Sequence, residues 1–246
     1  MEPIFRMSQT VEAMHVDRFQ RLKPSAILYF AQEAAAEHCK VLQLDWETLA
    51  SRDLFWAIIR QKVEITRLPK CGETITIETW PMPTTRSAFP RATVAYDETG
   101  KELFSVMGLW VLMNLKTRTM MLPGKSGIDL AGITRGCELS APGSLSPKEL
   151  EHTMVRTVRF SELDRNGHMN NTRYMDWLTD LLPSDFHRDH PIKNFTICYA
   201  NEALENQEIS LSWQLTEEGV LQADAHRSKT DVSGGKDRVF AAQVGF

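Results

Sequence analysis

Residues 160–177 read FSELDRNGHMNNTRYMDW, and this is the most informative stretch of the chain. Asp164, Asn166 and His168 lie two residues apart, so an extended backbone would direct all three side chains to the same side. A strand-like segment leads into this loop and an amphipathic helix leaves it, with Asn170 as a suitable N-cap. Three polar side chains at the start of a helix indicate a functional site. Taken alone, the same residues are also typical of a simple turn with a helix cap, because Asp, Asn and Gly favour turns.

The chain contains an internal repeat, which becomes visible when its two halves are aligned. Asp17 aligns with Asp164, an offset of 147 positions (164 − 17), and an arginine follows each aspartate. A strand-like segment precedes each aspartate, and a segment with helical spacing of apolar residues follows it. The expected strand and helix are 7–14 and 24–42 in the first half, and 154–160 and 174–182 in the second.

The remaining residues of each half read as antiparallel strands separated by turns, two of which are expected at 217–219 and 233–235. One helix followed by such strands, twice, predicts an α+β fold in which each half is an antiparallel sheet wrapped around a central helix. The expected domains are residues 1–121 and 151–246, joined by a linker at 122–150 that is rich in Gly, Pro and Ser. The expected strands are 55–66, 73–80, 87–97, 103–114, 194–201, 208–215, 221–228 and 238–244.

Composition and charge exclude several broad classes of protein. The 246 residues are 42% hydrophobic, which is ample for a core, and a formal charge of -4 gives no support for binding nucleic acid or a membrane surface. The four cysteines are scattered without a C-x-x-C pair, as reduced cytosolic thiols are. The longest apolar run, 103–113, is too short to span a bilayer, and the N-terminus has no signal-peptide pattern. We therefore expect a cytoplasmic protein.

Two motifs of this chain occur together in one known family. The first is LDRNGHMNN at residues 163–171, with the tyrosine and tryptophan that follow it, and the second is Tyr-x-x-Glu, matched by Tyr199 and Glu202. With the segment 55–73, these motifs resemble the acyl-acyl-carrier-protein thioesterases across essentially the whole chain. The resemblance implies two tandem hot-dog domains and a hydrolase that releases fatty acids in fatty acid biosynthesis. The implied partner is acyl carrier protein that carries an acyl-phosphopantetheine.

Carried over residue by residue, the resemblance implies that Asp164, Asn166, His168 and Glu202 form the catalytic set. By hypothesis, Glu202 acts in concert with His168 to polarise a water molecule. Asp164 would orient and charge-balance the site, and Asn166 would hold water or substrate through its amide. The residue types leave open which of the two carboxylates is the base.

Particular positions of the sequence also indicate the nucleophile and the group that stabilises the oxyanion. Plant members of the family often carry a cysteine directly after the glutamate, but this chain has Ala203 there, so hydrolysis would be water-based. Cys198 reads as an ordinary strand residue. The oxyanion would face backbone N–H groups at the helix start, near Asn170 and Asn171, where the helix dipole contributes positive charge.

The first half lacks this polar set. Phe19 aligns with Asn166 and Arg21 with His168, and a separate alignment of the strands places Leu68 at the position of Glu202. A pseudo-dimer with one working site predicts this asymmetry, with the first half supplying the acyl pocket. A homodimer of the whole chain would be compatible with this arrangement but is not required.

Other chemistries find little support in the sequence, and no cofactor or metal is expected. Residues 124–126 read Gly-Lys-Ser, but Thr119 stands where a phosphate-binding loop requires glycine. His187 and His190 have no further ligand nearby in the sequence. Two rival functions stay open: hydrolysis of acyl-coenzyme A, and non-catalytic binding or sensing of an acyl chain.

Overall fold

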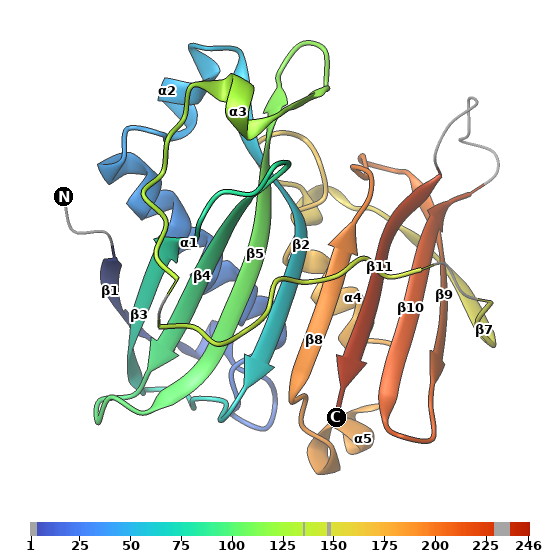
Figure 1. Ribbon diagram of the computed structural model, residues 1–246. Coiled ribbons are helices and arrows are strands. Elements are labelled where there is room, and N and C mark those ends of the chain that lie inside the picture. The colour runs from blue at the N-terminus through green and yellow to red at the C-terminus, as the bar shows by residue number, and fades with distance from the viewer. Residues whose placement is uncertain (1–3, 135, 147–148, 229–236) are drawn as a thin grey trace. The chain divides into compact units, whose positions relative to one another are not determined.

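The computed structural model describes residues 4–134, 136–146, 149–228 and 237–246. The chain forms two compact units, Met1–Pro142 and Gly143–Phe246. Each unit contains one antiparallel sheet with a helix packed on it, which is the α+β hot-dog architecture expected for each half (Figure 1). The turn expected at 233–235 lies outside the described residues.

The sheet of the first unit consists of β1 (Phe5–Thr10), β2 (Leu54–Ile65), β3 (Thr74–Pro81), β4 (Phe89–Tyr96), β5 (Glu102–Asn114) and β6 (Met120–Met121). Its strand order is β1-β3-β4-β5-β2, and β6 pairs with the end of β5. All of these pairs are antiparallel, so that Thr79 of β3, for example, lies opposite Thr93 of β4. The strands expected from the alternating sequence are therefore confirmed in this half.

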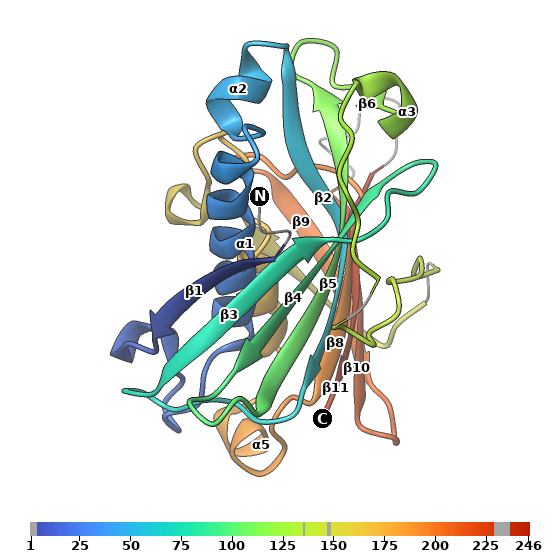
Figure 2. The same ribbon diagram turned by 60° about the vertical axis from the view of Figure 1, so that its left-hand side comes forward.

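The helix α1 (Pro24–Val41) lies along one face of this sheet and contacts β1 and β3 (Figure 2). Pro24 suits the first turn, because its fixed φ is helical and its missing N–H would have no acceptor there. Apolar residues such as Ile27, Phe30 and Ala34 recur at helical spacing and are buried. Complete burial of a large apolar side chain contributes about 1.5–3 kcal/mol. Two short helices, α2 (Trp46–Ala50) and α3 (Pro123–Ser126), complete the unit.

The opposite face of the same sheet is covered in part by the segment after α3. Successive side chains of a strand point to opposite faces, so Thr79 and Trp80 of β3 face opposite ways. Thr79 belongs to the face on which α1 lies, because Arg91 donates both to the hydroxyl of Thr79 and to Nδ1 of His38 on α1. Trp80 packs instead, with three strand residues, against the partly buried side chains of Ile133, Cys137 and Leu139. Part of the segment expected as a linker therefore packs on the first unit.

The sheet of the second unit consists of β7 (His152–Thr157), β8 (Asn194–Tyr199), β9 (Glu208–Leu215), β10 (Val220–Arg227) and β11 (Arg238–Gly245). Its order is β8-β11-β10-β9-β7, again antiparallel throughout. The helix α4 (Arg173–Thr179) packs on this sheet, with the ring of Tyr174 centred 4.7 Å from that of Phe240 on β11. A further short helix, α5 (Ser184–Asp189), follows α4.

The boundaries of several elements differ from the sequence expectation. The first strand ends at Thr10, because Ala13–His15 forms a turn of 3-10 helix. The helix expected to continue to residue 182 ends at Thr179, and Pro183 lies at the start of α5 instead. Among the described helices, none is long and apolar enough to cross a membrane.

Candidate active site

Asp164 organises the loop that carries the candidate residues. Its backbone N–H donates to the carbonyl of His168 at 2.8 Å, and its own carbonyl accepts from Gly167 at 3.0 Å. Its carboxylate oxygen Oδ1 accepts from the N–H groups of Asn166 (2.7 Å) and His168 (3.4 Å). Gly167 has φ of +78°, a left-handed conformation that the missing Cβ permits. The three polar residues therefore meet in a tight turn rather than along an extended segment.

The same turn lies beside the segment that follows β8. Met169 donates its N–H to the carbonyl of Ala203 at 2.8 Å, and His168 forms an isolated bridge with Leu204. As a result, His168 Nε2 lies 3.2 Å from Glu202 Oε2. The His168 side chain is 13% exposed and the Glu202 side chain 45%, so the pair is anchored on one side and open to water on the other.

Asn166 is the most peripheral member of the predicted set. Its residue is exposed, and its side-chain amide Nδ2 donates to Asp164 Oδ2 at 3.3 Å. The turn thus brings together Asp164, Asn166 and His168, and the neighbouring strand end adds Glu202. An imidazole against a half-exposed carboxylate has the arrangement needed to take a proton from water.

Asn170 and Asn171 lie ahead of the helix rather than within it. α4 begins at Arg173, and Asn170 Oδ1 accepts from the N–H and the hydroxyl of Thr172 at 2.9 and 2.8 Å. The carbonyl of Asn171 accepts from the hydroxyl of Tyr199 at 3.2 Å. The N–H of Asn171 donates to no acceptor in the part of the chain that the structure describes. That N–H is therefore not used by another group of the described chain.

Two tyrosines and a tryptophan pack beside the loop and hold it in place. Tyr174 and Tyr199 pack with ring centroids 5.6 Å apart, and burial raises the pKa of both phenols. Both tyrosines therefore keep their protons at neutral pH. Trp177 Nε1 donates to Glu162 Oε1 at 2.6 Å, which ties α4 to the residues just before Asp164. Tyr199, from the Tyr-x-x-Glu motif, thus joins β8 to the loop through a hydrogen bond.

The sequence analysis did not identify one residue that contacts this site. Arg227, at the end of β10, donates from Nη2 to the carbonyl oxygen of Glu202 at 2.8 Å. It lies 25 positions after Glu202 and at the end of a strand, where an arginine is usually a solvated side chain. Only its relation to Glu202 in the fold distinguishes it.

The first unit contains the same turn but lacks the polar side chains of the second. Asp17 accepts from the N–H groups of Phe19 (2.8 Å) and Arg21 (3.0 Å), as Asp164 does from Asn166 and His168. Arg21 in turn forms an ion pair with Asp17 at 3.1 Å. The structure therefore confirms the alignment of the two aspartates.

The strand side of that alignment is confirmed as well. Leu22 donates to the carbonyl of Pro69 as Met169 does to that of Ala203, so Leu68 occupies the position of Glu202. The same alignment sets Pro24, which has no N–H, at the position of Asn171.

The donors for a metal ion are not gathered at this site. Within the described ranges, no three His, Cys, Asp or Glu side chains lie close enough together to hold a metal ion.

Family models and relatives place this arrangement among known proteins. Models of the acyl-ACP thioesterase N-terminal and C-terminal domains match residues 2–122 and 146–241. The chloroplastic dodecanoyl-[acyl-carrier-protein] hydrolase of Cinnamomum camphora is 27% identical over 248 residues, which cover 94% of this chain and 60% of that protein. The chain thus spans less than two thirds of the length of this relative.

Two solved structures share the fold. An acyl-ACP thioesterase from Bacteroides thetaiotaomicron has a TM-score of 0.88 at 23% identity and covers 99% of this chain and 98% of its own. The 12:0-ACP thioesterase from Umbellularia californica has a TM-score of 0.81 at 23% identity, with 100% and 97% coverage.

Proposed function

Because the chain belongs to the acyl-ACP thioesterase family, we propose that it hydrolyses acyl-acyl carrier protein and releases a free fatty acid. The contact of 3.2 Å between His168 Nε2 and Glu202 Oε2 carries this proposal. It pairs an imidazole with a carboxylate that is still open to water, which is what activation of a water molecule requires. The partner in this proposal is acyl carrier protein with its acyl-phosphopantetheine.

Glu202 is the base of the proposed reaction. Asp164 uses its carboxylate within its own turn, where two backbone N–H groups and the Asn166 amide donate to it. Glu202 has a half-exposed carboxylate and a neighbouring imidazole. As water attacks the thioester carbonyl, its proton passes to the pair of Glu202 and His168.

The N–H of Asn171 stabilises the oxyanion of the tetrahedral intermediate. The carbon–sulfur bond then breaks, and the thiolate of the carrier's phosphopantetheine takes up the proton that His168 and Glu202 hold. A thiol has a pKa of about 8.5, so this leaving group needs little acid assistance. The exposed amide of Asn166 holds the water or the substrate at the mouth of the turn.

A cysteine nucleophile is absent from this proposal. Ala203, directly after Glu202, is fully buried and carries no reactive group. Cys198 donates from Sγ to the carbonyl of Gly143 at 3.4 Å and lies on β8, within the sheet.

The proposed function is tested by measuring fatty acid release from acyl carrier protein loaded with a series of chain lengths, beside the matching acyl-coenzyme A esters. We expect turnover of the carrier-protein substrates at one range of chain lengths. Equal or faster turnover of the coenzyme A esters would move the assignment to a general acyl thioesterase. Binding of the acyl substrates without hydrolysis would replace the enzyme with an acyl-binding protein.

The base is tested by the variant Glu202→Gln, which keeps the size of the side chain and removes its charge. The rate should fall on the order of 10²–10⁴-fold, because the general base is lost. Glu205→Gln is the matched control, since Glu205 is exposed on the same loop. If both variants retain wild-type rates, Glu202 is not the base.

A further inference from the structure

Arg227 holds the main chain of Glu202 from the neighbouring strand β10. Its Nη2 donates to the carbonyl oxygen of Glu202 at 2.8 Å. Its own backbone N–H donates to the carbonyl of Asp237 at 2.8 Å. Its Nε is buried and has no hydrogen-bond partner among the described residues. A buried donor without a partner costs free energy, so the stability of the fold alone does not account for this arginine.

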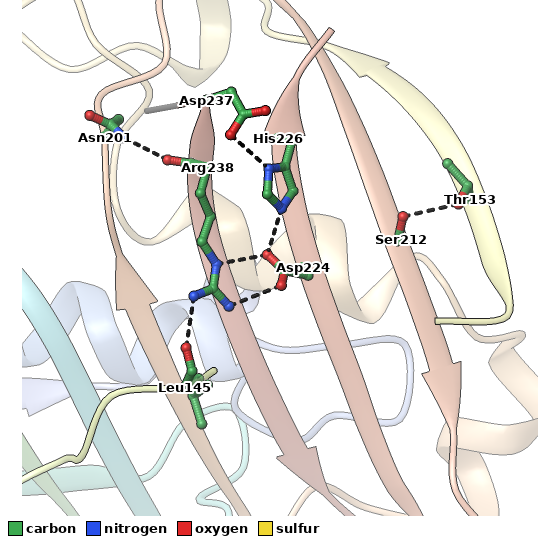
Figure 3. Close-up of polar contacts among 8 residues, drawn as sticks. All are labelled: Leu145, Thr153, Asn201, Ser212, Asp224, His226, Asp237 and Arg238. Carbon is green, nitrogen blue, oxygen red and sulfur yellow. Dashed lines mark hydrogen bonds and ion pairs between the residues drawn. The ribbon is translucent and has the colours of Figure 1, made fainter. Parts of the chain in front are cut away.

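A cluster of the Asp224, His226, Asp237 and Arg238 side chains lies next to Arg227 in the sequence and across the strand pair, and Figure 3 shows its contacts. His226, the preceding residue, contacts Asp237 Oδ1 through Nδ1 and Asp224 Oδ1 through Nε2, both at 3.1 Å. Ala225 and His226 of β10 pair with Phe240 and Arg238, so Val239 of β11 has no partner on β10, which marks a β-bulge in β11 opposite this point. Bulges redirect side chains and are common beside active sites. The bulge and the two carboxylates therefore fix the end of β10, from which the Arg227 side chain extends.

The same cluster also contacts Asn201, the residue before Glu202. Asp224 is only 3% exposed and accepts from Arg238 at 2.8 and 3.0 Å. The carbonyl of Arg238 accepts from Asn201 Nδ2 at 2.6 Å, as Figure 3 shows. The contacts thus run from Glu202 through Arg227 and the cluster back to Asn201, which is the residue bonded to Glu202.

Glu202 needs such support because it lies outside the sheet. β8 ends at Tyr199, and the last backbone bonds to β11 are made by Ala200 and Asn201, which both donate to the carbonyl of Val239. The Glu202 side chain is 45% exposed, so few packing contacts fix its position. The Arg227 hydrogen bond holds the main chain at the position from which the carboxylate reaches His168.

We propose that Arg227 is a positioning residue for the hydrolysis reaction, and that the cluster of Asp224, His226 and Asp237 holds Arg227 in place. This inference rests on the proposed function, because it assigns Arg227 to the geometry of the Glu202–His168 pair. A displacement of about 1 Å in a catalytic group can cost on the order of 10²-fold in rate.

The test compares Arg227→Met with Arg227→Lys in the full chain, on the acyl-carrier-protein substrate that the wild type turns over best. In Arg227→Met we expect kcat to fall roughly 10–100-fold with KM unchanged. Its Tm should change little, because the loss of the hydrogen bond to the Glu202 carbonyl is offset by the removal of the buried, unpaired Nε donor. Arg227→Lys should recover part of kcat, because its ammonium group can donate to the same carbonyl. Arg188→Met, on the exposed helix α5, is the control and should match wild type.

Two results would overturn the inference. One is wild-type kcat in Arg227→Met. The other is a parallel loss of kcat and Tm that lysine does not relieve, which marks a structural role. Failure of the proposed function is separate, because the wild type would then release no fatty acid. In that case the ¹⁵N shifts of the His168 ring still report the contact with Glu202, and they should change in Arg227→Met and stay unchanged in Arg188→Met.

Discussion

At the residue scale, the N–H of Asn171 offers a direct test of oxyanion stabilisation. In the first unit the equivalent residue is Pro24, so proline fits this backbone path. The variant Asn171→Pro removes the N–H and should lower kcat on the order of 10²–10³-fold. Asn171→Ala keeps the N–H and removes only the side chain, so it should retain most of the activity. Single-turnover measurements of fatty acid release with both variants check this expectation, and equal rates in the two would contradict it.

Part of the site could be predicted from residue types and spacing, and part could not. The extended segment predicted from the spacing of Asp164 and His168 was wrong, because Asp164 closes a tight turn with its backbone and its carboxylate. The turn itself follows from the residue types, since Asp, Asn and Gly favour turns. Glu202 was identified through its motif, although its contact with His168 depends on how β8 ends. Arg227 could not be predicted, since its contact is with a backbone carbonyl 25 positions away. A contact with a distant backbone carbonyl leaves no signal in the pattern of side chains along the sequence.

At the element scale, α1 carries a histidine whose burial makes stability depend on pH. His38 is 1% exposed, and Arg91 Nη1 on β4 donates to its Nδ1 at 3.0 Å. Burial, reinforced by the charge of Arg91, lowers the pKa of His38 from 6.5 to about 4. Between these two values the unfolded chain binds a proton at this residue and the folded chain does not. The free energy of unfolding therefore falls as the pH is lowered through this range.

The size of this effect gives a second expected outcome. Between pH 7 and pH 5 the loss from His38 amounts to about 2 kcal/mol. His38→Gln, which does not titrate and can still accept from Arg91, should lose that much less over the same range. Urea denaturation of both proteins at the two pH values measures the difference. Equal losses in the two proteins would show that His38 does not contribute.

The elements themselves were predictable where they are long. α1 and the strands of both units show periods of about four and two residues over enough positions to be recognised. α2 and α5 span 5 and 6 residues, which is too short for a helical period to appear. The helix α4 ends before Pro183, and a turn at residues 180–181 and a bend at residue 182 follow it. Proline marks the limit of a helix, but it does not require the helix to reach it.

At the scale of the whole molecule, the segment after α3 determines where the first unit can be separated. A fragment of residues 1–142 keeps Ile133, Cys137 and Leu139 against Trp80, whereas a fragment of residues 1–121 exposes that apolar face. Because such patches promote association, the shorter fragment should aggregate more readily. Size-exclusion chromatography of the two fragments at equal concentration tests this. A monomeric 1–121 fragment as stable as 1–142 would be the opposite result.

The turn around Asp17 bears on how related sequences are interpreted. The first unit has kept the aspartate and the backbone geometry of the loop, yet it carries Phe19, Arg21 and Leu68 where the second unit has polar groups. The hydrogen bonds that Asp17 accepts from the backbone therefore account for an aspartate at this position without any catalytic role. An aspartate at this position in a newly sequenced relative therefore indicates the loop, and under the proposed function it is the histidine and the distant glutamate together that would indicate a catalytic copy.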